Sequence, residues 1–338
     1  MRRLHFDDLR TQVLVRIRGY ITVSDPAWNV MILQDEAGEG ARVQSSDFSA
    51  PANQLVEVTG FAAAGGSTPT IAKPVIRWIS LQKPPDPKQI SLEQMLDPAV
   101  QYTQVVVQGV IRATTADRHN RITGLMRVKD KLVHVRVIDE STVDVNTLVD
   151  CDVRIKGVVE DSYDIFGNAG NPTLWVVRGT DVKKETSAPL PSSLEIRSTR
   201  SLQHYRSDQP PRHRVRLHGR VFTDKSDSSL LIKDATGTLP LELAPSAVFL
   251  TGPDLDAIGF VVSSQGKLFL GNTVLMRPIS TSGERGALPT LKTVAKIHSL
   301  SPEQAASEYP VHLRGVITYY DRKYSMLFVQ DATGGIFI

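Results

Sequence analysis

The alternation of apolar and polar residues follows nearly the same course four times along the chain. Each copy starts with an alternating run that reaches a glycine, and these glycines are Gly19, Gly109, Gly219 and Gly315. A second apolar run follows and ends on an aspartate: Asp35, Asp130, Asp234 and Asp331. Because such alternation is typical of a half-buried strand, every copy predicts a β unit. The glycines are 90, 110 and 96 residues apart, so each unit is long enough to bury its own core.

The strands expected within the copies follow one order. They are 12–23, 30–34, 40–44, 54–60 and 70–79 in the first copy, and 104–113, 123–129, 132–138, 151–160 and 174–178 in the second. In the third copy the later strands are 238–243, 258–263 and 267–276. A hairpin, a third strand, a short helix or loop and a final hairpin form the plan of the OB-fold barrel. The sequence therefore predicts an all-β protein of tandem OB-like five-stranded barrels with short connecting helices.

The expected domain boundaries follow from these strands. We predict barrels over 1–81, 104–185 and 212–280, linkers over 82–103, 186–211 and 281–309, and the start of a truncated fourth barrel over 310–338. Three linker segments have the pattern of a helix-starting capping box: 91–94, 301–304 and, more weakly, 192–195. Each later barrel is therefore expected to follow a short helix.

Three of the aspartates that end the second run belong to a turn. We interpret Asp35, Asp234 and Asp331 as turn residues and not as metal ligands or acids. Aspartate accepts a hydrogen bond from its own backbone two residues on, and the glycine that follows supplies the positive φ of a tight hairpin.

Composition sets limits on the kind of protein. Of the 338 residues 41% are hydrophobic, and the formal net charge of +3 gives no overall field that demands a nucleic-acid or membrane partner. The single cysteine, Cys151, excludes an intrachain disulfide and is expected to be buried and inert. No apolar stretch is long enough to span a membrane. Met1 to Arg3 could begin an export signal, but charged residues stand where its apolar core belongs.

The sequence shows no catalytic signature. The eight histidines form no paired metal motif, and neither a phosphate-binding glycine loop nor a nucleophile elbow is present. We therefore predict a protein that is not an enzyme and has no cofactor and no metal site.

Two sets of residues are candidates for binding. A basic segment with interleaved aromatic residues could bind single-stranded nucleic acid, through Arg197, Arg200, Arg206, Arg212, Arg214 and Arg216. Against this, the second and third strands are mostly Leu, Ile, Val and Met, where a nucleic-acid-binding barrel would gather aromatic residues. A barrel rim for a small ligand or a protein could instead include Trp28, in the loop between the first two strands, and Tyr319 and Tyr320 at the corresponding place of the fourth copy.

The fourth copy carries the clearest family resemblance. Segments 297–306, 309–321 and 327–337 resemble the repeat in the N-terminal sensory region of very large bacterial sensor and hybrid histidine kinases, and 213–219 and 105–110 are similar to its other copies. The resemblance implies a periplasmic sensing segment ahead of a membrane span and a kinase core, but it carries no ligand residues.

The predicted function is a non-catalytic region of a bacterial signal-transduction protein that senses a small ligand or a protein partner. The alternative is an OB-fold array that binds single-stranded nucleic acid. Because the fourth copy stops within its third strand, we expect a fragment of a longer protein; a complete chain would instead be cytoplasmic.

Overall fold

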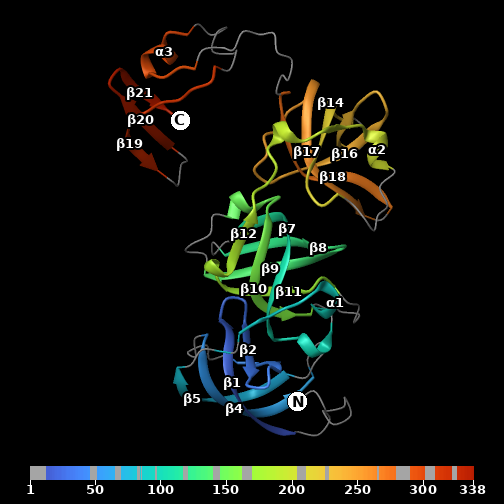
Figure 1. The fold of residues 1–338 in the computed structure, drawn as a ribbon, viewed down its shortest axis with the longest axis vertical. Coiled ribbons are helices and arrows are strands. Elements are labelled where there is room, and N and C mark those ends of the chain that lie inside the picture. Colours follow the sequence, from blue (N-terminus) through green and yellow to red (C-terminus); the bar gives the residue numbers. More distant parts are fainter. Residues whose placement is uncertain are drawn as a thin grey trace. The chain divides into compact units, whose positions relative to one another are not determined.

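The computed structural model describes residues 13–45, 52–64, 70–81, 84, 86–95, 97–116, 121–139, 145–161, 170–203, 211–224, 228–264, 266–278, 290–300, 309–321 and 326–338. These residues form four β-sheets with short helices between them, so the predicted all-β class and the tandem OB-like barrels are confirmed (Figure 1). The chain divides into two units, Met1–Pro278 and Ile279–Ile338. The expected domain boundaries remain predictions.

The first barrel has the strand order β3-β2-β1-β4-β5. Its strands are β1 (Leu14–Asp25), β2 (Val30–Asp35), β3 (Gly40–Arg42), β4 (Gln54–Ala63) and β5 (Thr70–Leu81). A parallel bridge between Val43 and Ile71 connects the end of β3 to β5. The Gln44 amide strengthens this contact by donating to the Ile71 carbonyl at 2.8 Å.

The second barrel is closed. Its strands are β7 (Gln104–Ala116), β8 (Ile122–Val128), β9 (Lys131–Asp139), β10 (Asp152–Glu160) and β11 (Thr173–Arg178), with β6 (Lys88–Gln89) and β12 (Val182–Thr186) added at the sides. β9 and β11 pair in parallel, and β10 pairs with β7 to complete the ring.

The third barrel repeats this topology. Its strands are β14 (Val215–Thr223), β15 (Leu230–Lys233), β16 (Thr238–Leu243), β17 (Gly252–Ser264) and β18 (Lys267–Met276), and the short β13 (Ile196–Arg197) pairs with β14. β16 and β18 pair in parallel, and β14 closes on β17. In the unit Ile279–Ile338, β19 (Val316–Asp321), β20 (Met326–Asp331) and β21 (Gly334–Phe337) form a three-stranded sheet.

Short helices lie in the connections. They are α1 (Leu92–Met95), η2 (Pro98–Val100), η3 (Val145–Leu148), η4 (Gly179–Asp181), η5 (Pro191–Ser193), α2 (Thr199–Gln203) and α3 (Val294–His298). The capping box before α1 is confirmed, because Ser91 N donates to Gln94 Oε1 at 2.8 Å. The box at 192–195 was a wrong prediction, since the α-helix of that linker starts only at Thr199. The box at 301–304 lies outside the described residues.

The repeat glycines allow two strands to approach closely. A Cβ on Gly19 would lie 2.6 Å from the Gln34 carbonyl oxygen, and one on Gly109 would lie 2.5 Å from that of Arg127. Gly219 and Gly315 meet the carbonyls of the equivalent strands. The first strand therefore continues through its glycine, pairing with the fourth strand before it and with the second strand after it. The predicted strands 12–23 and 104–113 likewise include their glycines.

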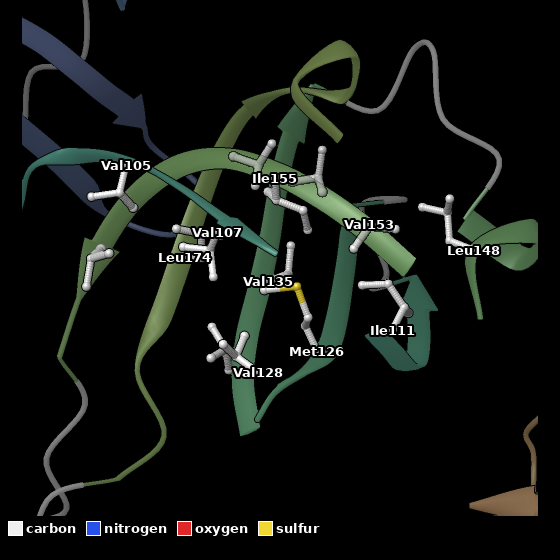
Figure 2. Packing of buried hydrophobic residues seen from close by; sticks show 14 of the residues in the cluster. Val105, Val107, Ile111, Met126, Val128, Val135, Leu148, Val153, Ile155 and Leu174 are labelled. Atoms are coloured by element: carbon white, nitrogen blue, oxygen red, sulfur yellow. The ribbon is translucent and has the colours of Figure 1, made fainter. Parts of the chain in front are cut away.

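The core of the second barrel lies inside this ring. Figure 2 shows side chains from β7 to β11 pointing into one cluster, including Ile111, Met126, Val135, Ile155 and Leu174. These are the inward positions of alternating strands, and each fully buried aliphatic side chain stabilises the fold by roughly 1.5–3 kcal/mol. Cys151 belongs to the same cluster and is buried, as expected.

The turn aspartates also dock the preceding linker. Asp234 accepts hydrogen bonds from Thr236 N at 2.7 Å, within its turn, and from Thr199 N at 2.6 Å, at the start of α2. Asp331 accepts likewise from Val294 N at 2.8 Å, at the start of α3. The turn assignment is confirmed, but the positive φ expected of the glycine occurs only in the first copy, at Gly38 (φ 86°).

Candidate functional site

The outer side of β8 and β9 carries basic side chains. Along both strands, buried and half-buried residues alternate, and the half-buried ones point outward. Register pairs Thr123 with Arg136, Leu125 with His134 and Arg127 with Leu132. On the adjoining β11, Thr173 lies opposite His134 and Trp175 opposite Arg136. We call these eight residues the cationic face: Thr123, Leu125, Arg127, Leu132, His134, Arg136, Thr173 and Trp175. None of them is acidic.

Burial lowers the pKa of two bases on this face. The pKa of Arg127 is lowered by burial, against a smaller opposing attraction from Asp130. The pKa of His134 is lowered by burial and then by Arg136, so the imidazole is neutral at neutral pH. A bound anion would offset both effects, because a nearby opposite charge favours the protonated form of a base.

Trp28 packs at one end of the cationic face. Its ring meets that of Trp175 edge-on, with centroids 5.4 Å apart. The Arg136 guanidinium lies 5.7 Å from the Trp28 centroid and 5.0 Å from that of Trp175, and Arg121 lies 5.1 Å from Trp28. Arg121 also forms an ion pair with Asp25. Trp28 therefore lies in the loop that the sequence predicted, but it packs between the first two barrels.

Glu160 and Arg42 belong to the same contact between the first two barrels. Trp175 donates from Nε1 to Glu160 Oε2 at 2.7 Å, and Arg42 of the first barrel pairs with Glu160. Trp175 is buried, so its ring is not an open platform on which a base could stack.

The first barrel has its equivalent face covered. Val23, Val30 and Ile32 point away from that barrel's own core and form a separate buried cluster with Tyr102 and Trp175. In the third barrel the outward positions of β15 and β16 are half-buried or exposed and include one charge of each sign, Lys233 and Glu242.

The predicted arginine cluster does not form one groove. Arg212 pairs with Asp152, Arg214 donates to the Asn272 side chain at 2.9 Å, and Arg216 is buried against Asp256 at 2.7 Å. Arg197 lies half-buried on β13, Arg200 lies exposed on α2, and Arg206 lies outside the described residues.

Tyr319 and Tyr320 lie within β19 and not in a loop, so their predicted placement was wrong. Their exposed fractions are 49% and 64%. The Tyr319 ring contacts Phe328 edge-on at 6.1 Å within the same sheet. The structure describes no contact that would make these two side chains a ligand site.

Within the described ranges, no group of three or more His, Cys, Asp or Glu is placed to hold a metal ion. Among the same residues, no helix has the length and apolarity that crossing a membrane requires. The expectation of a protein without catalysis or cofactor remains a prediction.

Comparisons with known proteins give only weak similarities to solved structures. No family model and no curated protein matches the chain. Similar solved structures include the Ifi202 HINa domain in complex with 20-bp dsDNA, with 10% identity over 53% of this chain and 97% of that one and a TM-score of 0.26. A replication protein A heterotrimer bound to ssDNA matches with 7% identity over 80% and 79%, and a TM-score of 0.23. An aspartyl tRNA synthetase from Entamoeba histolytica matches with 15% identity over 30% of this chain and only 22% of its own length, and a TM-score of 0.24. TM-scores this low decide neither fold nor function; the fold follows from the strand order.

Sequence reasoning missed Arg127, His134 and Arg136 as a group. The available signal was the polar half of the alternation in the second and third strands, which is cationic in this copy. The segment 197–220 has more arginines per residue, so charge density alone favours it over these strands.

Proposed function

We propose that this chain binds single-stranded nucleic acid through the cationic face of the second barrel. The observation that carries the proposal is that Arg127, His134 and Arg136 are spread along the outer side of strands two and three, without a carboxylate among the eight residues. OB barrels use this side for oligonucleotides.

The same geometry limits the kind of binding. Arginines attract the phosphates of any sequence, and stacking on aromatic rings would add affinity for bases. Because Trp175 is buried and Trp28 packs against it, phosphate contacts supply most of the affinity. We therefore expect binding that is weak, dependent on salt and largely independent of sequence.

A charge inserted into the face provides the test. Thr123→Glu places a carboxylate opposite Arg136, whereas the matched Thr238→Glu changes an exposed strand position of the third barrel. We expect Thr123→Glu to weaken binding of a thymidine oligonucleotide at low salt about tenfold or more, while Thr238→Glu stays close to the unmodified chain. Equal binding by both variants, measured by fluorescence anisotropy, would refute the proposed face.

The sensory-region hypothesis rests on the repeat and its family resemblance. It remains a prediction, together with the periplasmic compartment and the kinase context. The two functions differ in the partner that they require, so the oligonucleotide titration also separates them.

A further inference from the structure

The second and third barrels are connected by hydrogen bonds around Arg112 of β7. Arg112 donates from Nη2 to the Pro211 carbonyl at 3.0 Å. Asn272 of β18 donates from Nδ2 to the Arg112 carbonyl at 2.7 Å and accepts from Arg214 Nη2 at 2.9 Å. Both guanidinium groups lie over the ring of Phe260, at 4.2 Å for Arg112 and 5.2 Å for Arg214.

A cavity of about 480 Å³ opens beside this cluster. Its walls are largely apolar and come from both barrels: Leu125, Leu132, Leu243, Phe260 and Phe269. This volume is in the range of sites that hold small molecules, roughly 300–1,000 Å³, and such sites combine apolar walls with a few placed polar groups.

The positive charge in the cavity is buried and incompletely bonded. Arg112 lines the cavity although only 6% of its surface is exposed, and within the described part of the chain its Nε has no hydrogen-bond partner. Burial, and then repulsion by Arg127, lowers the pKa of Arg112 to about 10, against the attraction of Asp150. The lining carboxylates, Asp130 and Glu242, belong to exposed residues. The cavity therefore has a buried cation in its wall and acidic groups on exposed residues.

We propose that this cavity binds a small organic carboxylate with a flat, apolar body. The carboxylate lies against the Arg112 side chain in the cavity wall, where its opposite charge offsets the burial of that cation. The apolar body packs among the leucines and Phe269. The site is distinct from the proposed nucleic-acid function, although Leu125, Arg127 and Leu132 also belong to the cationic face.

A matched pair of probes tests the charge requirement. Indole-3-acetate carries the carboxylate, and indole-3-acetamide has almost the same shape without the charge. We expect calorimetry on the whole chain to detect indole-3-acetate, with the amide at least tenfold weaker. Equal affinity for the two probes, or no binding of indole-3-acetate up to about 10 mM, would overturn the proposal.

A second pair of variants tests the location. Ser263 is an exposed residue that lines the cavity, whereas the exposed Ser264 follows it outside the lining. We expect Ser263→Trp to abolish binding of indole-3-acetate, because the new tryptophan ring fills the cavity. Ser264→Trp should change the affinity for indole-3-acetate less than about twofold, because its ring lies outside the cavity. If indole-3-acetate still binds the Ser263→Trp variant, its site is not this cavity. Oligonucleotide binding is measured on both variants, and its presence or absence decides the nucleic-acid proposal independently.

Discussion

In the first barrel the outer side of β2 is covered, whereas in the second barrel the outer side of β8 is open. Register makes the positions comparable: Gln34 pairs with the residue after its repeat glycine, and Arg127 does the same in the next barrel. Gln34 is buried and accepts from Gln104 N at 3.1 Å, while Arg127 lines an open cavity. The same fold position is therefore buried in the first barrel but lines a cavity in the second.

The largest expected difference between the two faces is in stability. Ile32 is fully buried on the covered face, and Leu125 is the half-buried outward residue of β8. Ile32→Ala should lower the free energy of unfolding by about 2–5 kcal/mol, because it leaves a cavity between the barrels. Leu125→Ala should cost less than about 1 kcal/mol. If urea denaturation shows equal losses of unfolding free energy for the two variants, the two faces do not differ in burial as described.

The next largest expected effect on stability comes from the close approach between the first barrel and the linker that follows it. A Cβ on Gly40 would overlap the backbone of Tyr102. Gly40→Ala should therefore cost about 1–3 kcal/mol, as overpacking does in a well-packed region. Gly252→Ala is the control, because its Cβ would meet nothing nearer than 3.9 Å. If the two variants melt at the same temperature, the linker does not cover the first barrel as described.

The turn aspartates give a smaller, pH-dependent difference. Partial burial raises the pKa of Asp234, but hydrogen bonds from Thr199 and Thr236 outweigh it and lower the pKa to about 2 from 3.8. A lowered folded-state pKa stabilises the fold above the unfolded value, and this contribution is lost as the pH falls from about 4 to 2. Solvent screening keeps it near about 1 kcal/mol.

Asp234→Asn should remove this contribution, so the variant should lose less stability than the unmodified chain as the pH falls from about 4 to about 2. Asp35→Asn is the matched control, since Asp35 accepts from Glu39 N at 2.8 Å within its own turn. Parallel pH profiles for the unmodified chain and Asp234→Asn would refute the docking role.

Most strand positions could be predicted because alternation is a local signal. The observed β16 and β18 match the expected ranges, and β8 differs from its range by a single residue at each end. β17 starts at Gly252, six residues before its predicted start. Pro253 and two aspartates interrupt the apolar pattern there, so alternation did not indicate this part of the strand. One of them, Asp256, is buried against Arg216, a partner 40 residues away that no local pattern indicates.

The candidate site was harder to predict for the same reason. Charge density selected Arg212, Arg214 and Arg216, but partners distant in sequence hold all three. Trp28 was selected as a loop residue at the barrel rim, and its contact with Trp175 is equally nonlocal. The cationic face depends on which outward positions remain uncovered, and that requires the arrangement of neighbouring elements.

The central claim is tested most directly by the salt dependence of oligonucleotide binding. With Arg127 and Arg136 as the charged contacts at neutral pH, the logarithm of the binding constant should fall against the logarithm of salt concentration with a slope of about −1.4 for a single strand. Arg127→Ala should reduce the slope to about −0.7, and Lys233→Ala in the third barrel should leave it unchanged. Binding without salt dependence, or a slope that Arg127→Ala does not change, would contradict the account.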